Sequence, residues 1–214
     1  MTFDSIYEMT TPLTEVRKQR MVEEFNGDDI DSFRWTFSRS AGGTSDSPSV
    51  MADELDGGFK WTTHNSNTTY YGSMNTGAKY AFDAGSSGFI ASHRMNDNDA
   101  GTEDYYFYVG LDEDSYFQFH GHTNNTYFKL SVRNNLIGTA TTDTTTPRDS
   151  MWHTFKAVTN GTRVIGTVDG VVNSTMTYPI PSSGAGDLRP NWQVANQGGT
   201  SKTASIRYFE AWNI

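Results

Sequence analysis

The chain has 214 residues, a net charge of −9 and no cysteine. An acidic surface repels phosphate backbones, so nucleic acid is excluded as an expected partner, and the lack of cysteine excludes disulfide scaffolds and cysteine-based zinc sites. Hydrophobic residues make up 35% of the chain and aromatic residues 14%, a balance that favours half-buried β-sheet surfaces over packed helices or disorder.

The first 22 residues differ from the rest of the chain. They show no positively charged start followed by an apolar run, so we expect no signal peptide, and no apolar stretch in the chain approaches the roughly 18 residues of a membrane span. Residues 14–24 (TEVRKQRMVEE) have a helical pattern that Thr14 can cap. We expect residues 1–22 to form an N-terminal arm or short helix, with a frayed terminus as the alternative, and residues 23–214 to form one domain.

From residue 23 onward, short alternating segments separated by polar turns predict an all-β fold, a two-sheet antiparallel jelly-roll sandwich. Phe117 and Phe119 share one face of a predicted strand, whereas residues 105–109 (YYFYV) are almost continuously apolar and predict a strand buried on both faces. The predicted strands are residues 22–25, 35–38, 50–54, 58–62, 79–83, 88–94, 104–110, 116–120, 128–133, 153–159, 163–168, 171–176, 192–196 and 206–212.

Three places combine aromatic rings with polar side chains. Glycan binding needs this chemistry, because a sugar face stacks on a ring while the sugar hydroxyls form hydrogen bonds. The alternative for each ring is packing in the core or at a strand edge. The three candidate places are Asn67 with Tyr70 and Tyr71, His122 with Asn124 and Tyr127, and Trp192.

Two short segments hold candidate metal ligands. Asp97 and Asp99 follow a predicted strand and offer oxygen ligands in a loop, as calcium prefers, so a calcium ion is the cofactor that this loop would take. The alternative is an ordinary Asn/Asp loop without metal. His120 and His122 share one face of a predicted strand, but no third ligand is evident, which favours polar residues at a strand end.

Residues 152–176 predict a three-stranded meander. Asn160-Gly161 and Asp169-Gly170 are tight-turn pairs, because these residues tolerate a positive φ, and strand-like segments lie on either side of each pair.

This meander resembles a segment common in the concanavalin A-like lectin/glucanase superfamily, of the laminin-G-like type. The segment pairs a Trp-His dipeptide with later Asn-Gly and Asp-Gly turns, here Trp152-His153, Asn160-Gly161 and Asp169-Gly170. Residues 24–27 resemble the first strand of that superfamily and residues 206–212 the last strand. The resemblance covers residues 23–214 and implies that these two strands pair.

The glucanases of this superfamily use a Glu-x-Asp-x-(x)-Glu strand motif, in which alternate carboxylates line one cleft. Glu54-Leu55-Asp56 matches the first half, but Gly57, Gly58, Phe59 and Lys60 follow, so the acid carboxylate is missing. We therefore expect no catalytic residue and no enzyme.

A sandwich with a short arm and no signal peptide is similar in construction to virion proteins of tailed viruses. We expect a non-enzymatic structural or attachment protein, such as a capsid decoration, turret or tail module, made in the host cytoplasm and located in the virion. Its expected partners are copies of itself, other virion proteins bound through residues 1–22, and cell-surface glycans. A free carbohydrate-binding lectin is the alternative, and a diverged glycoside hydrolase is the third hypothesis.

Overall fold

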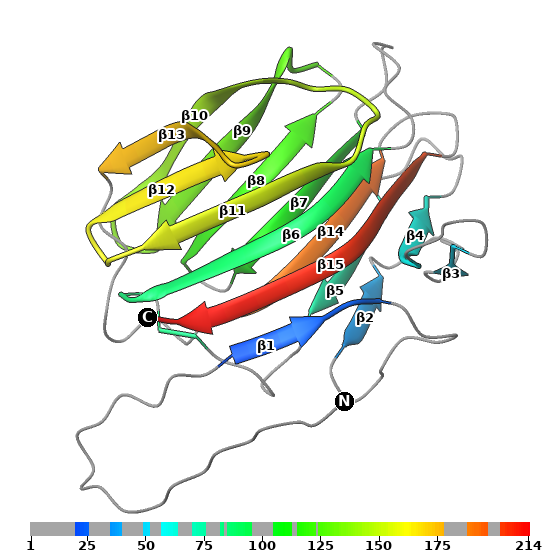
Figure 1. Ribbon diagram of the computed structural model, residues 1–214, viewed down its shortest axis with the longest axis horizontal. Helices are drawn as coiled ribbons and strands as arrows, with labels where there is room; N and C mark the ends of the chain where they lie inside the picture. The colour runs from blue at the N-terminus through cyan, green and yellow to red at the C-terminus, as the bar shows by residue number, and fades with distance from the viewer. Residues whose placement is uncertain are drawn as a thin grey trace, which may run out of the picture.

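The computed structural model describes most of the predicted β region (Figure 1). The described residues are 20–25, 35–39, 49–51, 57–63, 70–75, 82–83, 85–95, 105–112, 115–122, 124–177, 188–196 and 202–214. All their regular structure is β-strand, so among them there is no helix that is long and apolar enough to cross a membrane.

Eight strands form one sheet, in the spatial order β13-β12-β11-β6-β15-β4-β3, with β1 also paired to β15. All of its strand pairs are antiparallel. The bounds are β1 (Arg20–Glu23), β3 (Ser49–Val50), β4 (Phe59–Thr62), β6 (Ser87–Met95), β11 (His153–Thr159), β12 (Arg163–Val168), β13 (Val171–Thr177) and β15 (Thr203–Asn213).

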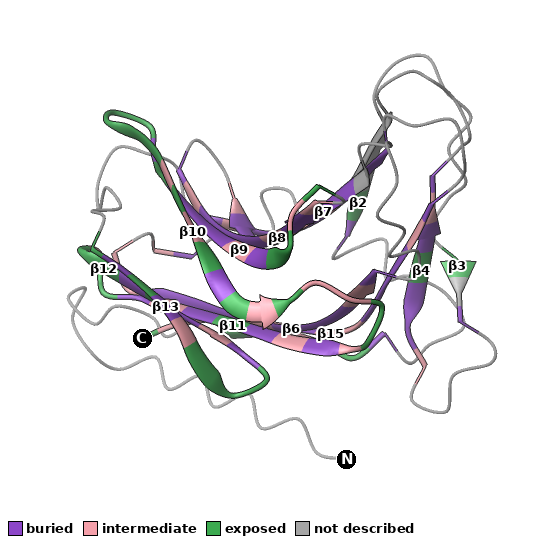
Figure 2. Ribbon diagram, turned by 90° about the horizontal axis from the view of Figure 1, so that it is seen from above, coloured by how far each residue is buried: buried purple, intermediate pink, exposed green. Residues whose placement is uncertain are grey.

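Seven strands form the second sheet, in the order β10-β9-β8-β7-β14-β5-β2, again with antiparallel pairs throughout. In Figure 2 this sheet bows toward the other layer in the middle, at β7 and β8, so its outer side is concave. The bounds are β2 (Thr36–Arg39), β5 (Tyr70–Asn75), β7 (Tyr105–Asp112), β8 (Tyr116–His122), β9 (Tyr127–Asn134), β10 (Gly138–Pro147) and β14 (Arg189–Asn196). The predicted two-sheet antiparallel sandwich is therefore confirmed.

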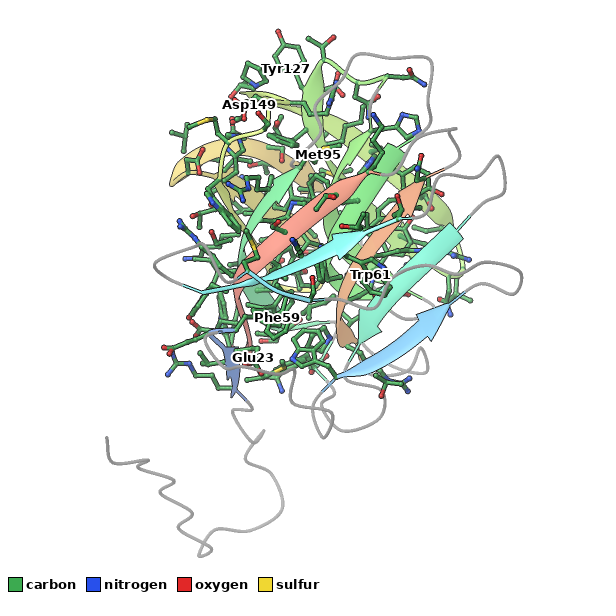
Figure 3. The ribbon with its side chains drawn as sticks, turned by 90° about the vertical axis from the view of Figure 1, so that its right-hand side faces the viewer. Glu23, Phe59, Trp61, Met95, Tyr127 and Asp149 are labelled. Carbon is green, nitrogen blue, oxygen red and sulfur yellow. The ribbon has the colours of Figure 1, made fainter. Side chains whose placement is uncertain are left out.

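Aromatic side chains fill the space between the sheets. Phe89 from β6 stacks on Phe209 from β15, with ring centroids 6.0 Å apart, and also contacts Phe117 from the opposite sheet at 5.8 Å. Phe59 and Trp61 of β4 are fully buried too (Figure 3). A period of two places every second residue of a strand in this layer, so burial of these rings decides which residues of each strand face outward.

The predicted meander is confirmed. Both residues of the Asp169-Gly170 turn have a positive φ as expected, whereas in the Asn160-Gly161 turn only Gly161 does. Asp169, Gly161 and Gly170 have φ values of 53°, 84° and 79°. β11, β12 and β13 follow one another in the eight-stranded sheet, as the two turns require.

The N-terminal prediction needs a correction where the chain is described. Residues 20–23 lie near the end of the segment with the helical pattern, and residues 22–25 were also predicted as a strand; residues 20–23 form β1, which pairs with Phe209–Trp212 of β15. Pairing lets Met21 reach the core, and this tertiary contact outweighs the local helical pattern. Residues 1–19 lie outside the described part, so the division into an arm of residues 1–22 and a domain of residues 23–214 stays a prediction. The family resemblance implied that residues 24–27 pair with residues 206–212; a first and a last strand do pair, but the first is β1 at residues 20–23.

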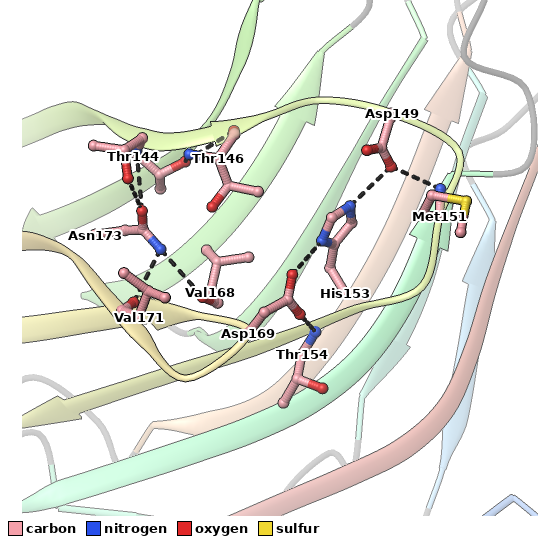
Figure 4. A network of polar contacts seen from close by, with 11 residues as sticks. Thr144, Thr146, Asp149, Met151, His153, Thr154, Val168, Asp169, Val171 and Asn173 are labelled. Carbon is pink, nitrogen blue, oxygen red and sulfur yellow. Dashed lines mark hydrogen bonds and ion pairs between the residues drawn. The ribbon is translucent and has the colours of Figure 1, made fainter.

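Side-chain hydrogen bonds close one end of the sandwich (Figure 4). His153 is bonded at Nδ1 to Asp169 (2.7 Å) and at Nε2 to Asp149 (2.8 Å), and Asp169 also accepts from the Thr154 amide (2.8 Å). The Trp-His and Asp-Gly parts of the predicted motif therefore meet in space, and their contact joins β11 to the β12–β13 turn.

Asn173 ties β13 of one sheet to β10 of the other (Figure 4). Its amide oxygen accepts from the backbone nitrogen (3.2 Å) and the hydroxyl of Thr145, and its amide nitrogen donates to the carbonyls of Val168 (3.2 Å) and Val171 (2.9 Å). One side chain thus satisfies groups from both layers.

We expect Asn173→Ala to lower the free energy of unfolding by about 1–3 kcal/mol, because it leaves several backbone groups without their partner. Urea denaturation followed by tryptophan fluorescence measures this change. Asn135→Ala, which removes an exposed amide from the β9–β10 turn, is the matched control and should change stability little. Equal, small effects from the two substitutions would contradict the bridging role of Asn173.

Candidate functional site

The outer side of the seven-stranded sheet has a regular layout that β7 sets. Phe107, Val109 and Leu111 are fully buried in the core, so Tyr106, Tyr108, Gly110 and Asp112 face outward. Residues that are paired directly across antiparallel strands share a face. The register therefore defines four outward rows that cross the sheet.

The rows run from β7 in both directions. On β8, His122, His120, Gln118 and Tyr116 are opposite the four outward residues of β7 in that order. On β14, Ala195, Gln193, Asn191 and Arg189 are opposite the same four. On β9, Lys129, Ser131 and Arg133 continue the rows from β8. We call this set of outward residues on β7, β8, β9 and β14 the concave face.

Aromatic rings form one half of the concave face. Tyr106 and His122 stack with centroids 5.4 Å apart and an interplanar angle of 9°. Tyr108 packs against His120 at 5.4 Å and against Tyr106 edge-on at 5.3 Å. Tyr106 is nearly buried whereas Tyr108 is half-buried, so Tyr108 is the tyrosine of this group that offers more of its ring to a ligand.

Polar side chains form the other half. Asn191 donates to the carboxylate of Asp112 at 3.5 Å, a long hydrogen bond. His120 Nε2, Ser131 Oγ and Thr141 Oγ1 form a chain with steps of 2.9 and 2.8 Å. Gln118 is buried, and its amide oxygen has no hydrogen-bond partner, an arrangement that costs about 1–3 kcal/mol.

Burial keeps His120 uncharged. Desolvation lowers the pKa of His120 to about 4, with smaller contributions in the same direction from Lys129 and His122, while Asp143 opposes them. His120 is therefore a neutral hydrogen-bonding group at neutral pH. In the core, burial lowers the pKa of His93 well below its usual value, and its ring stacks on Phe107 at 3.9 Å.

Few carboxylates lie on the described part of the concave side. Asp112 lies at the end of β7, and Asp143 of β10 forms an ion pair with Lys129 at 3.2 Å. β10 is three strand spacings of ~4.8 Å from β7, and the register puts Thr139, four residues before Asp143, in the row of Asp112. At ~3.4 Å per residue along the strand, the two carboxylates are roughly 20 Å apart, wider than the ~5–9.5 Å that glycoside hydrolysis uses. None of the described strands carries carboxylates at alternate positions of one face. Glu54 and Asp56 lie outside the described residues.

On the outer side of the eight-stranded sheet, polar and aromatic side chains contact one another. Trp152 is half-buried, and the guanidinium groups of Arg94 and Arg207 contact its ring at 4.7 and 4.6 Å from the centroid. On the same side, Glu210 accepts from Arg20 at 2.7 Å and from Tyr208 at 2.5 Å. Polar and aromatic groups here bind one another, so the concave face is the better candidate site.

The structure places part of one predicted group on the concave face. His122 stacks on Tyr106 there, whereas Asn124 and Tyr127 lie in and after the β8–β9 turn, both exposed. Figure 3 shows Tyr127 at the same end of the sandwich as Asp149, and the Arg148 amide donates to the Thr126 carbonyl at 2.9 Å. This turn therefore lies at the rim of the sandwich.

The other predicted glycan residues have different outcomes. Trp192 is fully buried and packs on Trp61 with centroids 6.0 Å apart, so its predicted role as a surface platform is wrong. The alternation of side chains along β14 explains the error, because Asn191 and Gln193 face outward and Trp192 between them faces inward. Tyr70 and Tyr71 lie in β5, next to β14, and Asn67 lies outside the described residues.

Tyr106, Tyr108 and Gln118 were missed as site residues. Residues 105–109 were expected to be buried on both faces, because tyrosine was counted as apolar. The sequence signal that identifies them is alternation: Phe107, Val109 and Leu111 on β7 face the core, so the residues between them face outward. Phe117 and Phe119 continue this alternation on β8.

The described residues contain no group of three or more His, Asp or Glu side chains that could hold a metal ion. Asp97 and Asp99 lie outside them, so the calcium site stays a prediction. His120 and His122 share the concave face as expected, with His120 bonded to Ser131 and His122 stacked on Tyr106.

Comparisons by sequence identify no relative: no family profile matches the chain, and no curated protein matches it. Solved structures do match the fold. The Bacteroides ovatus mixed-linkage glucan GH16 protein, in complex with a G4G4G3G product, has a TM-score of 0.66 at 15% identity, over 88% of this chain and 98% of that chain. A β-1,3-glucanase from Mycobacterium marinum has a TM-score of 0.62 at 17% identity, over 90% and 97%. A family 16 glycosyl hydrolase from Mycobacterium smegmatis has a TM-score of 0.61 at 15% identity, over 90% and 99%.

These structures share the predicted jelly-roll fold and contradict two predictions from the sequence. The expected virion structural or attachment protein, and the expectation that the chain is not an enzyme, are both corrected, because the matching structures are glycoside hydrolases rather than virion proteins. The error arose because general construction was used to infer function, and because the absence of one strand motif was taken as the absence of catalysis.

The pKa of His120 gives a testable dependence of stability on pH. The unfolded chain takes up this proton near pH 6.5, whereas the folded chain takes it up only near pH 4, so the protein should lose stability as the pH falls from about 6.5 to 4. We expect His120→Gln to weaken this dependence, measured as the melting temperature at several pH values in that window. His93, which His120→Gln leaves in place, contributes equally to both proteins. Parallel pH profiles for the wild type and the variant would contradict the buried neutral state of His120.

Proposed function

We propose that the chain is a glycoside hydrolase that binds a glycan along the concave face. The observation that carries this proposal is the alternation on β7, which turns Tyr106 and Tyr108 outward beside histidine and amide side chains. The likeness of the fold to glucanases supports the choice of reaction.

Tyr108 is the main platform in this proposal. Its half-buried ring lies near the middle of the sheet, between His120 on β8 and Gln193 on β14. A pyranose ring has one apolar face that stacks on an aromatic ring, and its hydroxyls at the edge reach neighbouring polar groups. Gln193 and Asn191 lie on the adjacent strand for this purpose.

Hydrolysis of a glycosidic bond needs an acid to protonate the leaving oxygen and a second carboxylate to act as nucleophile or base. Asp112 lies on the same face as Tyr108, two outward positions farther along β7. Asn191 donates a hydrogen bond to its carboxylate at 3.5 Å. We assign Asp112 as one carboxylate of the reaction.

The proposal predicts that the full-length protein binds and cleaves a glycan from a panel of mixed-linkage β-glucan, β-1,3-glucan and mucin O-glycans. Tyr108→Ala should weaken binding about ten-fold, because the stacking platform is lost. Asp112→Asn should lower the turnover rate by about 10²–10⁴ while keeping the affinity. Affinity electrophoresis measures binding, and a reducing-end assay measures cleavage. Lys156→Ala, on the outer side of the other sheet, is the control and should change neither.

Three outcomes would count against the proposal. A protein that binds no glycan of the panel contradicts the binding face. Binding without any cleavage contradicts the hydrolase and leaves a lectin. Full cleavage by Asp112→Asn contradicts the assignment of Asp112.

A further inference from the structure

The row of the concave face that passes through Gly110 is buried, although it points away from the core. Ser131, Gln118 and Asn191 are the side chains of this row on β9, β8 and β14, and their exposed fractions are 4%, 5% and 6%. Polar side chains with so little contact with water need hydrogen bonds within the protein. A side chain of this row that lacks a hydrogen bond within the protein would therefore indicate a ligand as its partner.

Gln118 is the residue of this row with an unsatisfied hydrogen-bond acceptor. Its amide oxygen is fully buried and accepts no hydrogen bond. Ser131 beside it already bonds to His120 and Thr141, and Asn191 across Gly110 already donates to Asp112. Gly110, directly opposite, has no side chain to offer.

Gly110 cannot be replaced by a residue that would supply the missing partner. A Cβ atom at this position would lie 2.5 Å from the Phe117 carbonyl oxygen and 2.7 Å from Cα and Cβ of Gln118. The close approach of β7 and β8 thus requires glycine. It also leaves no side chain on the outward side of β7 between Tyr108 and Asp112.

We propose that Gln118 is a specificity-determining residue of the concave face, whose amide bonds a hydroxyl group of the sugar unit that lies over Gly110. This proposal rests on the proposed function and deepens it. The last torsion of a glutamine side chain is broad, so the amide can turn to meet a hydroxyl as acceptor or donor. Tyr108 then stacks on one sugar unit while Gln118 selects for the hydroxyl pattern of the unit beside it.

Gln118→Met separates this role from a structural one, because methionine keeps the volume and removes the amide. A ligand-binding role predicts a melting temperature that is unchanged or higher, since a buried group without a partner is removed. It also predicts at least about a ten-fold loss of affinity for the oligosaccharide that the wild type binds, measured by calorimetry. Gln193→Met, which removes a partly exposed amide from the neighbouring row, controls for the effect of the substitution on stability.

A series of monodeoxy analogues of that oligosaccharide identifies the hydroxyl. One analogue should bind the wild type about ten-fold more weakly than the parent sugar, yet bind Gln118→Met as well as the parent does. Equal affinity of the wild type and Gln118→Met, or a lower melting temperature without loss of affinity, would overturn the role of Gln118 and leave the proposed function standing. If Gln118→Met does not fold, a wild type that tolerates every monodeoxy analogue would overturn it. A wild type that binds no glycan would overturn the proposed function itself.

Discussion

Burial of aromatic rings between two sheets is the constraint that determines the rest of this structure. Phe89 stacks on Phe209 within the eight-stranded sheet and contacts Phe117 and Phe119 of the opposite sheet, and their neighbours extend this contact through both sheets. Since strand residues alternate, each ring placed inward also places the next residue outward. The concave face is therefore a direct consequence of the core, because a shift of β7 by one residue would exchange Tyr108 for Val109.

The two outer faces use this alternation differently. On the eight-stranded sheet, outward groups bind one another, as Arg94, Trp152 and Arg207 do in their stack. On the concave face, the bow of the sheet brings aromatic and amide side chains together, and the amide oxygen of Gln118 is left without a hydrogen-bond partner. Buried polar atoms without a hydrogen bond are expected at functional sites, because function can outweigh their cost in stability. The concave face of a fold shared with a glucanase is therefore a reasonable location for the unpaired amide oxygen of Gln118.

Much of the fold could be predicted from the sequence, whereas little of the site could be. Turn pairs such as Asp169-Gly170 act locally, so the meander was predicted correctly with its strand order. Residues 20 and 21 were assigned to a helical segment and only residues 22–25 to a strand, because the pairing with β15 depends on residues far along the chain. The site depends on which strands become neighbours: Gly110 lies between Gln118 and Asn191 only after β14 inserts beside β7. The prediction for Trp192 was wrong for a related reason. Its indole ring suits a sugar platform, but its position in the alternation of β14 places it in the core.

The most direct measurement is a crystal structure of the protein with an oligosaccharide from the glycan that it binds best. The account predicts sugar density on the outer side of β7, β8 and β14, with one ring stacked on Tyr108 and a hydroxyl within hydrogen-bonding distance of Gln118. Sugar bound at the rim beside Tyr127, or on the outer side of the eight-stranded sheet near Trp152, would contradict it.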